Sequence, residues 1–131
     1  MSATSTDTRP PRRSRQPSAE ARSWAFMRLS GLALLFFALV HFAITHVIND
    51  VVETDYDFVA ERWHNPAWRV FDWMLLVLAL SHGANGLRWI VDDYVRDPGR
   101  RKAVKGLLYG LTGVLVVVGT LTILAFPSRP R

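Results

Sequence analysis

His82 is the strongest candidate for a functional residue in this sequence, because it is an ionisable residue within a largely apolar segment. Small residues lie beside it at Gly83, Ala84 and Gly86. In a helix, Gly86 lies near the same face as His82, which leaves room for a flat group to approach the imidazole. A b-type haem is such a group, since it needs an imidazole ligand but no cysteine linkage. The alternative is a histidine hydrogen-bonded to a serine or a carbonyl of a neighbouring helix.

Asp93 and Tyr94 continue this pattern towards the end of the same segment. At 100° per residue, Asp93 projects almost together with His82, about 16 Å further along the helix axis. A phenol beside a carboxylate can donate a hydrogen bond to a quinone carbonyl and help to move a proton when the quinone is reduced. A tyrosine in an interfacial belt and an aspartate at a helix end are the alternative interpretation.

Arg28 precedes the first long apolar segment, with Ser30 two residues later. We expect Arg28 to open the first helix at the depth of Asp93 and Tyr94. There, its guanidinium could pair with a haem propionate or polarise a quinone oxygen. It could equally mark the orientation of the helix.

The histidines of the first apolar segment are harder to place. We expect His41 several ångströms further outward than His82, so that one haem clamped between the two would need an unusual tilt. A second ligand from another subunit is therefore preferred. His41 is then a packing residue or the ligand of a second, outer haem, and His46 receives no role.

Three apolar segments must position these residues. Segments 29–48 and 106–126 contain no Asp, Glu, Lys or Arg, and each is long enough to span a hydrocarbon core of about 30 Å. A third, at 71–91, has Asp72 and Arg88 near its ends, from where we expect both side chains to reach the membrane interface. The predicted fold is an all-α integral membrane protein with three transmembrane helices, at about 28–48, 70–91 and 104–126.

Composition limits the alternatives. The 131 residues suffice for one domain, and the absence of cysteine excludes disulfide scaffolds, thiolate catalysis and Cys-ligated zinc or iron–sulfur clusters in this chain. The net charge of +5 would fit a nucleic-acid binder only if charged and apolar residues were mixed, and they are segregated. We expect residues 1–22, rich in Ser, Pro and Arg, to form a disordered basic tail, and residues 23–131 to form the membrane anchor domain.

The basic residues predict the orientation. Residues 1–28 carry six arginines and residues 92–105 carry five Arg or Lys, whereas the connection at 49–69 has five acidic residues against two arginines. The positive-inside rule places the N-terminus and the 92–105 connection in the cytoplasm, and the acidic connection and the C-terminus outside. The chain is thus predicted to be a multi-pass protein of the cell membrane.

Together these residues resemble the hydrophobic membrane anchor subunit of succinate dehydrogenase, the succinate:quinone oxidoreductase of respiratory chains. The resemblance covers about residues 24–126 and includes the arginine of MRLSG, at Arg28. Its most specific part is a run on the second of three helices: Ser81, His82, Gly83, Gly86, Asp93 and Tyr94.

The resemblance implies an anchor that pairs with a second three-helix subunit, the cytochrome b556 subunit, and docks a flavoprotein and an iron–sulfur subunit. FAD and iron–sulfur clusters then belong to those partners. Within the anchor pair, His82 would be one axial ligand of haem b and the partner subunit would supply the other. Tyr94 would hydrogen-bond the quinone, Asp93 would support it, and Arg28 would lie near the haem propionates and the quinone.

The Arg- and Ala-rich composition resembles that of actinobacterial members, which implies menaquinone. An anchor of a fumarate reductase and a cofactor-free scaffold or assembly protein are the alternatives. A transporter is disfavoured because no helix is interrupted and no repeat is visible. The basic tail is better explained by orientation at the lipid surface than by nucleic-acid binding.

Overall fold

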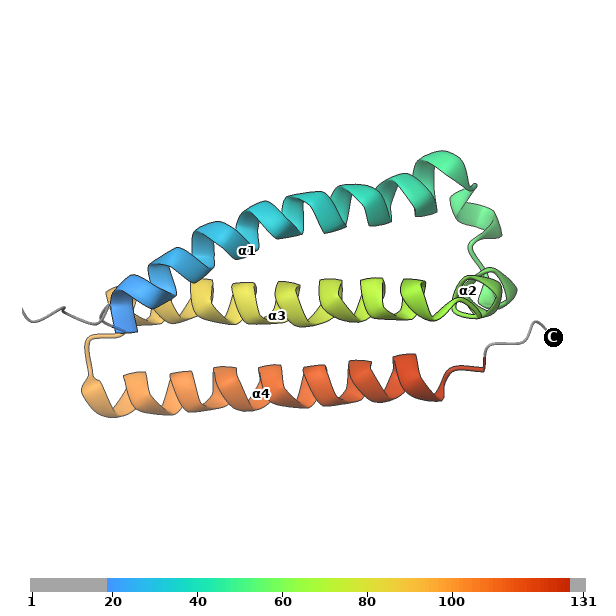
Figure 1. Ribbon diagram of the computed structural model, residues 1–131. Helices are drawn as coiled ribbons and strands as arrows, with labels where there is room; N and C mark the ends of the chain where they lie inside the picture. The colour runs from blue at the N-terminus through green and yellow to red at the C-terminus, as the bar shows by residue number, and fades with distance from the viewer. Residues whose placement is uncertain (1–18, 128–131) are drawn as a thin grey trace, which may run out of the picture.

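The computed structural model describes residues 19–127, and this part of the chain is helical with short connections (Figure 1). Three helices are long and apolar enough to cross a membrane, which confirms the predicted fold class. The elements in chain order are α1 (Ala19–Phe42), its π-helical continuation η1 (Ala43–Ile48), the 3-10 turn η2 (Val51–Glu53), α2 (Tyr56–Arg62), α3 (Pro66–Tyr94) and α4 (Pro98–Ala125).

The long helices begin earlier than the apolar segments predict. Residues 19–22, expected in the tail, are the first turn of α1, while residues 1–18 of the expected tail lie outside the described part. Helix α3 begins at Pro66 because the Asn65 side chain accepts a hydrogen bond from the Ala67 amide, and α4 begins at Pro98 after the capping residue Asp97. These signals lie in polar connections, beyond the reach of a hydropathy pattern.

The three long helices form an open layer with α3 in the middle (Figure 1). Helix α3 packs against both α1 and α4, whereas α1 and α4 have hardly any contact with each other. Few side chains in the described part are buried, and these are small or medium-sized: Ser30, Thr45, Ala60, Ala84 and Ile123. Most large apolar side chains therefore face outward, where lipid or other subunits would cover them.

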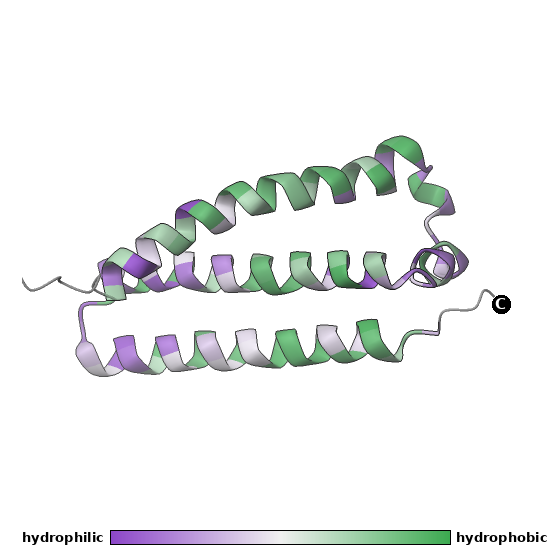
Figure 2. Ribbon diagram, in the orientation of Figure 1, coloured by the Kyte–Doolittle hydropathy of each residue, from purple (hydrophilic) through white to green (hydrophobic). Residues whose placement is uncertain are grey.

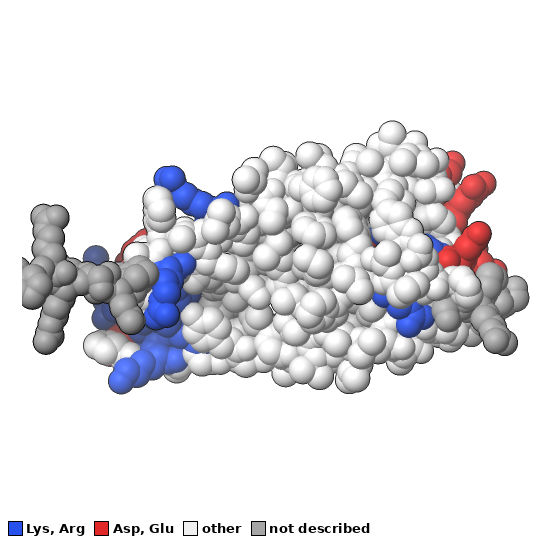
Figure 3. All heavy atoms as spheres, viewed as in Figure 1, with Lys and Arg blue, Asp and Glu red and all other residues white. Residues whose placement is uncertain are grey.

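Polar and charged residues gather at the two ends of the layer (Figures 2 and 3). We call the end formed by the start of α1 and the α3–α4 connection the basic end. The opposite end, formed by residues 49–65, is called the acidic end, because five of the eleven acidic residues of the sequence lie in this stretch. This segregation is the pattern expected for a membrane protein, and the predicted orientation places the basic end in the cytoplasm.

The glycines of α4 differ in their surroundings. A Cβ atom at Gly119 would lie 2.5 Å from Cδ2 of Leu76 on α3, so this glycine allows the two helices to approach closely. A Cβ at Gly106, Gly110 or Gly113 would meet nothing within 4 Å. Gly119 therefore serves the packing of α4 against α3 within the chain.

We expect Gly119→Ile to destabilise the packing of α3 against α4 by about 1–3 kcal/mol, because the added side chain overlaps Leu76. The measurement is the thermal unfolding midpoint of the purified protein in detergent, with Gly110→Ile as the matched control on the open face of α4. Equal midpoints for the two variants would contradict this interpretation of Gly119.

Candidate functional site

His82 lies on α3 and faces Ser30, a buried residue of α1. The Ser30 Oγ atom is 2.7 Å from His82 Nδ1 and 3.4 Å from the carbonyl oxygen of Met27. If the hydroxyl donates its one proton to that carbonyl, Oγ accepts the Nδ1–H of His82 and the lone pair stays on Nε2. Nε2 has no hydrogen-bond partner within residues 19–127. The imidazole is thus held by one nitrogen and can offer the other.

This geometry is compatible with both interpretations of His82, the haem ligand and the structural histidine. The hydrogen bond to a serine of a neighbouring helix, expected for a structural histidine, is present. Metal-ligating histidines nevertheless almost always use their second nitrogen in such a bond, which fixes the tautomer and the ring orientation. The contact with Ser30 is therefore compatible with ligation through Nε2.

The glycines around His82 test whether a flat group fits. A Cβ at Gly31 would lie 3.4 Å from Cε1 of His82, so this glycine lets α1 approach the imidazole. Gly86, expected to face free space, instead faces Met27, whose Cε is 3.5 Å from the Cβ position, because α1 packs there. Space is open at Gly83, where a Cβ would meet nothing within 4 Å. The residues fit a haem that approaches from the uncovered side of α3.

The structure does not bring the other predicted site residues to His82. Arg28 is exposed, with its guanidinium 4.1 Å from the ring centre of Trp24. It lies nine residues after Ala19 in α1 and does not open the helix, contrary to expectation. Asp93 and Tyr94 are exposed in the last turn of α3. No ion pair, hydrogen bond or ring contact of the described chain joins these three residues to one another or to His82.

Tyr94 lies at the basic end, beside a groove at the start of α4. It is 82% exposed, which leaves the phenol free for a ligand or a partner subunit. The same groove is lined by the arginines of the α3–α4 connection and first turn of α4, Arg96 and Arg100. The cationic neighbours of Tyr94 within this chain therefore come from the α3–α4 connection and the start of α4, and not from α1 as the position of Arg28 suggested.

A polar seam between α1 and α3, which the sequence did not predict, leads from His82 towards the basic end. Ser23 donates a hydrogen bond from Oγ to Oδ1 of Asn85 (3.0 Å) and accepts one from Nη2 of Arg88 (2.8 Å). Arg88 is thus held between α1 and α3, with its side chain 17% exposed. No periodicity argument could connect Ser23 with residues more than sixty positions away.

Next to the seam, Asp92 joins the basic ends of the three long helices. Its carboxylate contacts three cations: Arg88 (4.0 Å), Arg101 (3.9 Å) and Lys105. Arg88 also lies 3.6 Å from Glu20 of α1. The spacing of four residues between Arg88 and Asp92 is a detectable helical signal. Asp93, the aspartate predicted from the sequence, is exposed in the structure.

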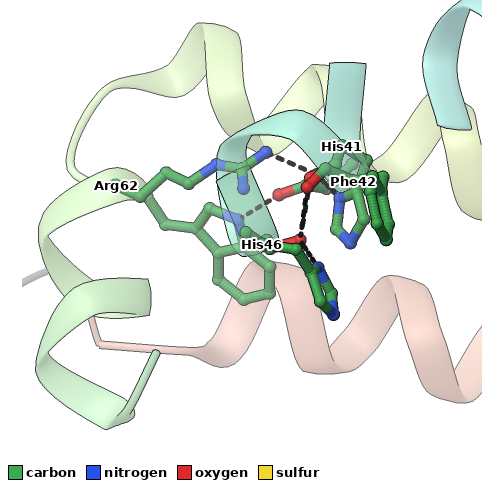
Figure 4. Close-up of polar contacts among 7 residues, drawn as sticks. His41, Phe42, His46 and Arg62 are labelled. Atoms are coloured by element: carbon green, nitrogen blue, oxygen red, sulfur yellow. Dashed lines mark hydrogen bonds and ion pairs between the residues drawn. The ribbon is translucent and has the colours of Figure 1, made fainter. Parts of the chain in front are cut away.

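A second polar cluster, around Asp72, lies at the acidic end (Figure 4). The Asp72 carboxylate accepts hydrogen bonds from Nη2 of Arg62 (2.9 Å) and Nε1 of Trp63 (2.8 Å), and lies 3.4 Å from Nδ1 of His41. The side chains of Asp72 and Arg62 are 13% and 9% exposed. Asp72 therefore ties α1, α2 and α3 together at this end of the layer.

His46 belongs to the π-helical end of α1. Its Nδ1 lies 2.7 Å from Oγ1 of Thr45, and its ring stacks on Phe42 with the centroids 4.7 Å apart. The Thr45 hydroxyl in turn donates to the carbonyl oxygen of His41 (2.9 Å). These contacts give His46 a local structural role.

The sequence model of the succinate dehydrogenase/fumarate reductase transmembrane subunit matches residues 5–126. The chain belongs to this family. Membership in the succinate dehydrogenase/fumarate reductase family confirms the resemblance based on the run from Ser81 to Tyr94, and the three long apolar helices agree with it.

Individual members of the family are similar along most of the chain. The "succinate dehydrogenase hydrophobic membrane anchor subunit" of Thermoplasma acidophilum is 28% identical over 93 residues, 71% of this chain and 76% of the relative. The protein of the same description from Archaeoglobus fulgidus is 32% identical over 94 residues, 71% and 75% of the two chains. "Succinate dehydrogenase 2 membrane subunit SdhC" of Mycobacterium tuberculosis is 26% identical over 110 residues, 84% and 80%.

Proposed function

We propose that this chain is the hydrophobic membrane anchor subunit of a succinate dehydrogenase. With a second anchor subunit, the cytochrome b556 subunit, it holds haem b and forms part of the site at which quinone is reduced. The electrons come from succinate through the flavoprotein and iron–sulfur subunits, which carry FAD and the iron–sulfur clusters. The fumarate-reducing direction, which the family description includes, would use the same residues.

The observation that carries the proposal is the arrangement of His82, in a chain of this family. Ser30 holds Nδ1, and Nε2 is free to bind the haem iron. When bound, the haem supplies a centre that takes up and releases single electrons. His82 would hold the haem iron through Nε2, Ser30 would fix the imidazole through Nδ1, and the partner subunit would supply a second ligand.

The open layer supports the proposed partner. The described part of the chain buries few side chains and leaves large apolar residues exposed on all three long helices. Packing against further helices would therefore stabilise it. The second three-helix anchor subunit would cover part of this surface and lipid the rest. The basic end would face the cytoplasm, where the soluble subunits dock, with the C-terminus outside.

Tyr94 and Asp93 are the proposed quinone residues. Reduction of a quinone consumes two electrons and two protons, and the exposed Tyr94 hydroxyl can donate a hydrogen bond to a quinone carbonyl. Asp93 supports this hydroxyl at the end of α3. Arg28, on the exposed face of α1, is available to a haem propionate or the quinone from that face. Menaquinone is the proposed quinone.

The test is purification of the complex that assembles with a tagged version of this chain, followed by a reduced-minus-oxidised spectrum and an assay of succinate-dependent quinone reduction. A b-type α-band together with the activity supports the proposal. Haem without succinate activity would indicate another quinone-linked oxidoreductase. An intact complex with neither signal would favour a cofactor-free scaffold.

Tyr94→Phe is expected to slow quinone reduction at least tenfold, because it removes the proton donor to the carbonyl. Succinate oxidation by an artificial dye should remain unchanged, since the dye takes electrons before the quinone. The matched control is Tyr109→Phe on α4, which removes a second tyrosine hydroxyl away from the proposed site. Equal slowing of both assays by Tyr94→Phe would rule out the quinone role.

A further inference from the structure

A groove of about 320 Å³ lies between the start of α3 and the end of α4, two helices that run side by side (Figure 1). It is lined by Arg69, Val70 and Trp73 of α3 and by Thr120, Ile123 and Leu124 of α4. The polar atoms of the indole and the threonine satisfy each other, because Nε1 of Trp73 donates a hydrogen bond to Oγ1 of Thr120 (3.0 Å). The groove is therefore apolar along its length, with one cation, Arg69, at its rim.

This groove opens towards the lipid. Both of its walls belong to helices that are long and apolar enough to span a membrane, and Val70 and Leu124 are 55% and 67% exposed. Further into the layer, α3 and α4 meet closely at Leu76 and Gly119, which confines the groove to the end of the two helices. Its volume falls within the range typical of ligand sites, about 300–1,000 Å³. A slender apolar chain entering from the bilayer fits this shape.

Arg69 carries a positive charge that no carboxylate of the described chain balances. Its Nε donates to the carbonyl oxygen of Trp63 (2.8 Å) and its Nη2 to the carbonyl oxygen of Phe126 (2.8 Å), and both acceptors are neutral. Nη1 has no hydrogen-bond partner within residues 19–127. The two bonds fix the guanidinium at the groove, while its charge and one of its nitrogens stay available to an anion.

The other half-buried arginines of the described chain differ from Arg69 in this respect. Arg62, Arg88 and Arg101 each lie within 4.0 Å of a carboxylate. Removing a charge from water without a counter-charge is costly, and these three ion pairs reduce that cost. Arg69 is equally half-buried but has no such pair, so its counter-charge must come from outside the described chain.

A free anion is a poor candidate for this role. The connection at 49–69 has five acidic residues against two arginines, so its overall charge repels small anions. An anion that carries its own apolar chain gains additional binding free energy from the groove. The chemistry of the site therefore favours an amphiphile with a negative head group.

We propose that this groove holds one acyl chain of an anionic phospholipid, whose phosphate pairs with the guanidinium of Arg69. The chain lies along Trp73 and Leu124, and the phosphate accepts a hydrogen bond from Nη1. The lipid binds in the leaflet at the acidic end. The site is on the side of α3 that faces α4 and does not depend on the haem or quinone roles proposed above.

The test uses the complex that assembles with this chain, purified in detergent, and a phosphatidylglycerol whose acyl chain carries a photoreactive diazirine. After illumination, labelled peptides are identified by mass spectrometry. We expect labelling within residues 66–76 and 117–126 that excess unlabelled phosphatidylglycerol removes. The same excess of phosphatidylcholine with identical chains, or of glycerol phosphate, should leave most of it in place.

Two substitutions at Arg69 test the role of its charge. Arg69→Gln keeps an amide donor for the two carbonyls but removes the charge. It should lower the preference for phosphatidylglycerol over phosphatidylcholine about fivefold, the contribution of one cation near an anionic lipid surface. Arg69→Lys should retain the preference. The matched control is Lys102→Gln, which removes an exposed cation at the basic end and should leave labelling of the groove unchanged.

A second pair of variants tests the groove and leaves Arg69 intact. Leu124→Trp places a larger side chain at an exposed position of the groove wall and should lower the labelling to the level seen with excess competitor. Leu121→Trp, at an exposed position of α4 that does not line the groove, should have no effect. The thermal unfolding midpoint shows which variants are folded, and if Arg69→Gln is not, Leu124→Trp and Arg69→Lys decide.

Three outcomes would overturn the proposal. Equal competition by phosphatidylcholine would show that the head-group charge is not recognised, and displacement by glycerol phosphate would indicate a site for free anions. Labelling that is absent from both segments, or unchanged in Leu124→Trp, would show that the groove holds no acyl chain. Haem content and quinone reduction do not enter the measurement, so a failure of the proposed function would leave this result interpretable.

Discussion

The His82→Ala complex is expected to lack the proposed b-type haem, with the ratio of haem to protein falling at least tenfold. The variant removes the imidazole whose Nε2 is free and whose Nδ1 is already held by Ser30, and alanine offers the iron no ligand. Haem content by pyridine haemochrome assay and the reduced-minus-oxidised spectrum measure this effect.

Two further variants give this prediction its controls. His46→Ala removes a histidine with local contacts only and should leave the haem content unchanged. Ser30→Ala keeps the ligand but frees Nδ1, and loss of such an outer partner typically weakens metal affinity by about 10–100-fold. Full haem occupancy in His82→Ala would exclude this residue as the ligand, whatever the behaviour of Ser30→Ala.

Asp72→Ala is expected to lower the free energy of unfolding by about 3–5 kcal/mol, the usual cost of leaving a buried ion-pair partner alone. Arg62, with only 9% of its side chain exposed, would lose its carboxylate, and the Trp63 indole N–H would lose its acceptor. Because these bonds tie α2 to α3, the connection at the acidic end should loosen first. The thermal unfolding midpoint of the assembled complex is the measurement.

The matched control is Glu53→Ala, which removes an exposed carboxylate from the same connection and should change stability by less than about 0.5 kcal/mol. Asp72→Asn, which keeps an acceptor oxygen but no charge, should fall between the two. If Asp72→Ala melts at the temperature of Glu53→Ala, the cluster has no stabilising role.

The three spans were predictable because membrane insertion depends on continuous apolar length, which a sequence displays directly. The true starts of α3 and α4 depend on Asn65 and Asp97, which cap their helices from polar connections. Hydropathy does not register a capping hydrogen bond, so the expected bounds were too short.

The candidate site was less predictable, because it depends on which helix faces which. Periodicity relates Asp93 to His82 on one helix, but it does not reveal that the cations of α4 meet the neighbouring carboxylate, Asp92. Likewise, the contact of Asp72 with Arg62 requires the connection to fold back over the start of α3. For His82, the sequence predicted a hydrogen bond to a serine of a neighbouring helix as one alternative, but it did not predict that this serine is Ser30.

The open layer of helices affects the stability of unassembled copies of this chain in the cell. With α3 covered on two sides only and little interior of its own, an unassembled copy would present apolar helix faces to any neighbour in the bilayer. Folding stability that is shared with a partner depends on the partner's concentration. We expect orphan copies to be cleared by membrane proteases, so that synthesis of the partner subunit sets the steady-state abundance of this one.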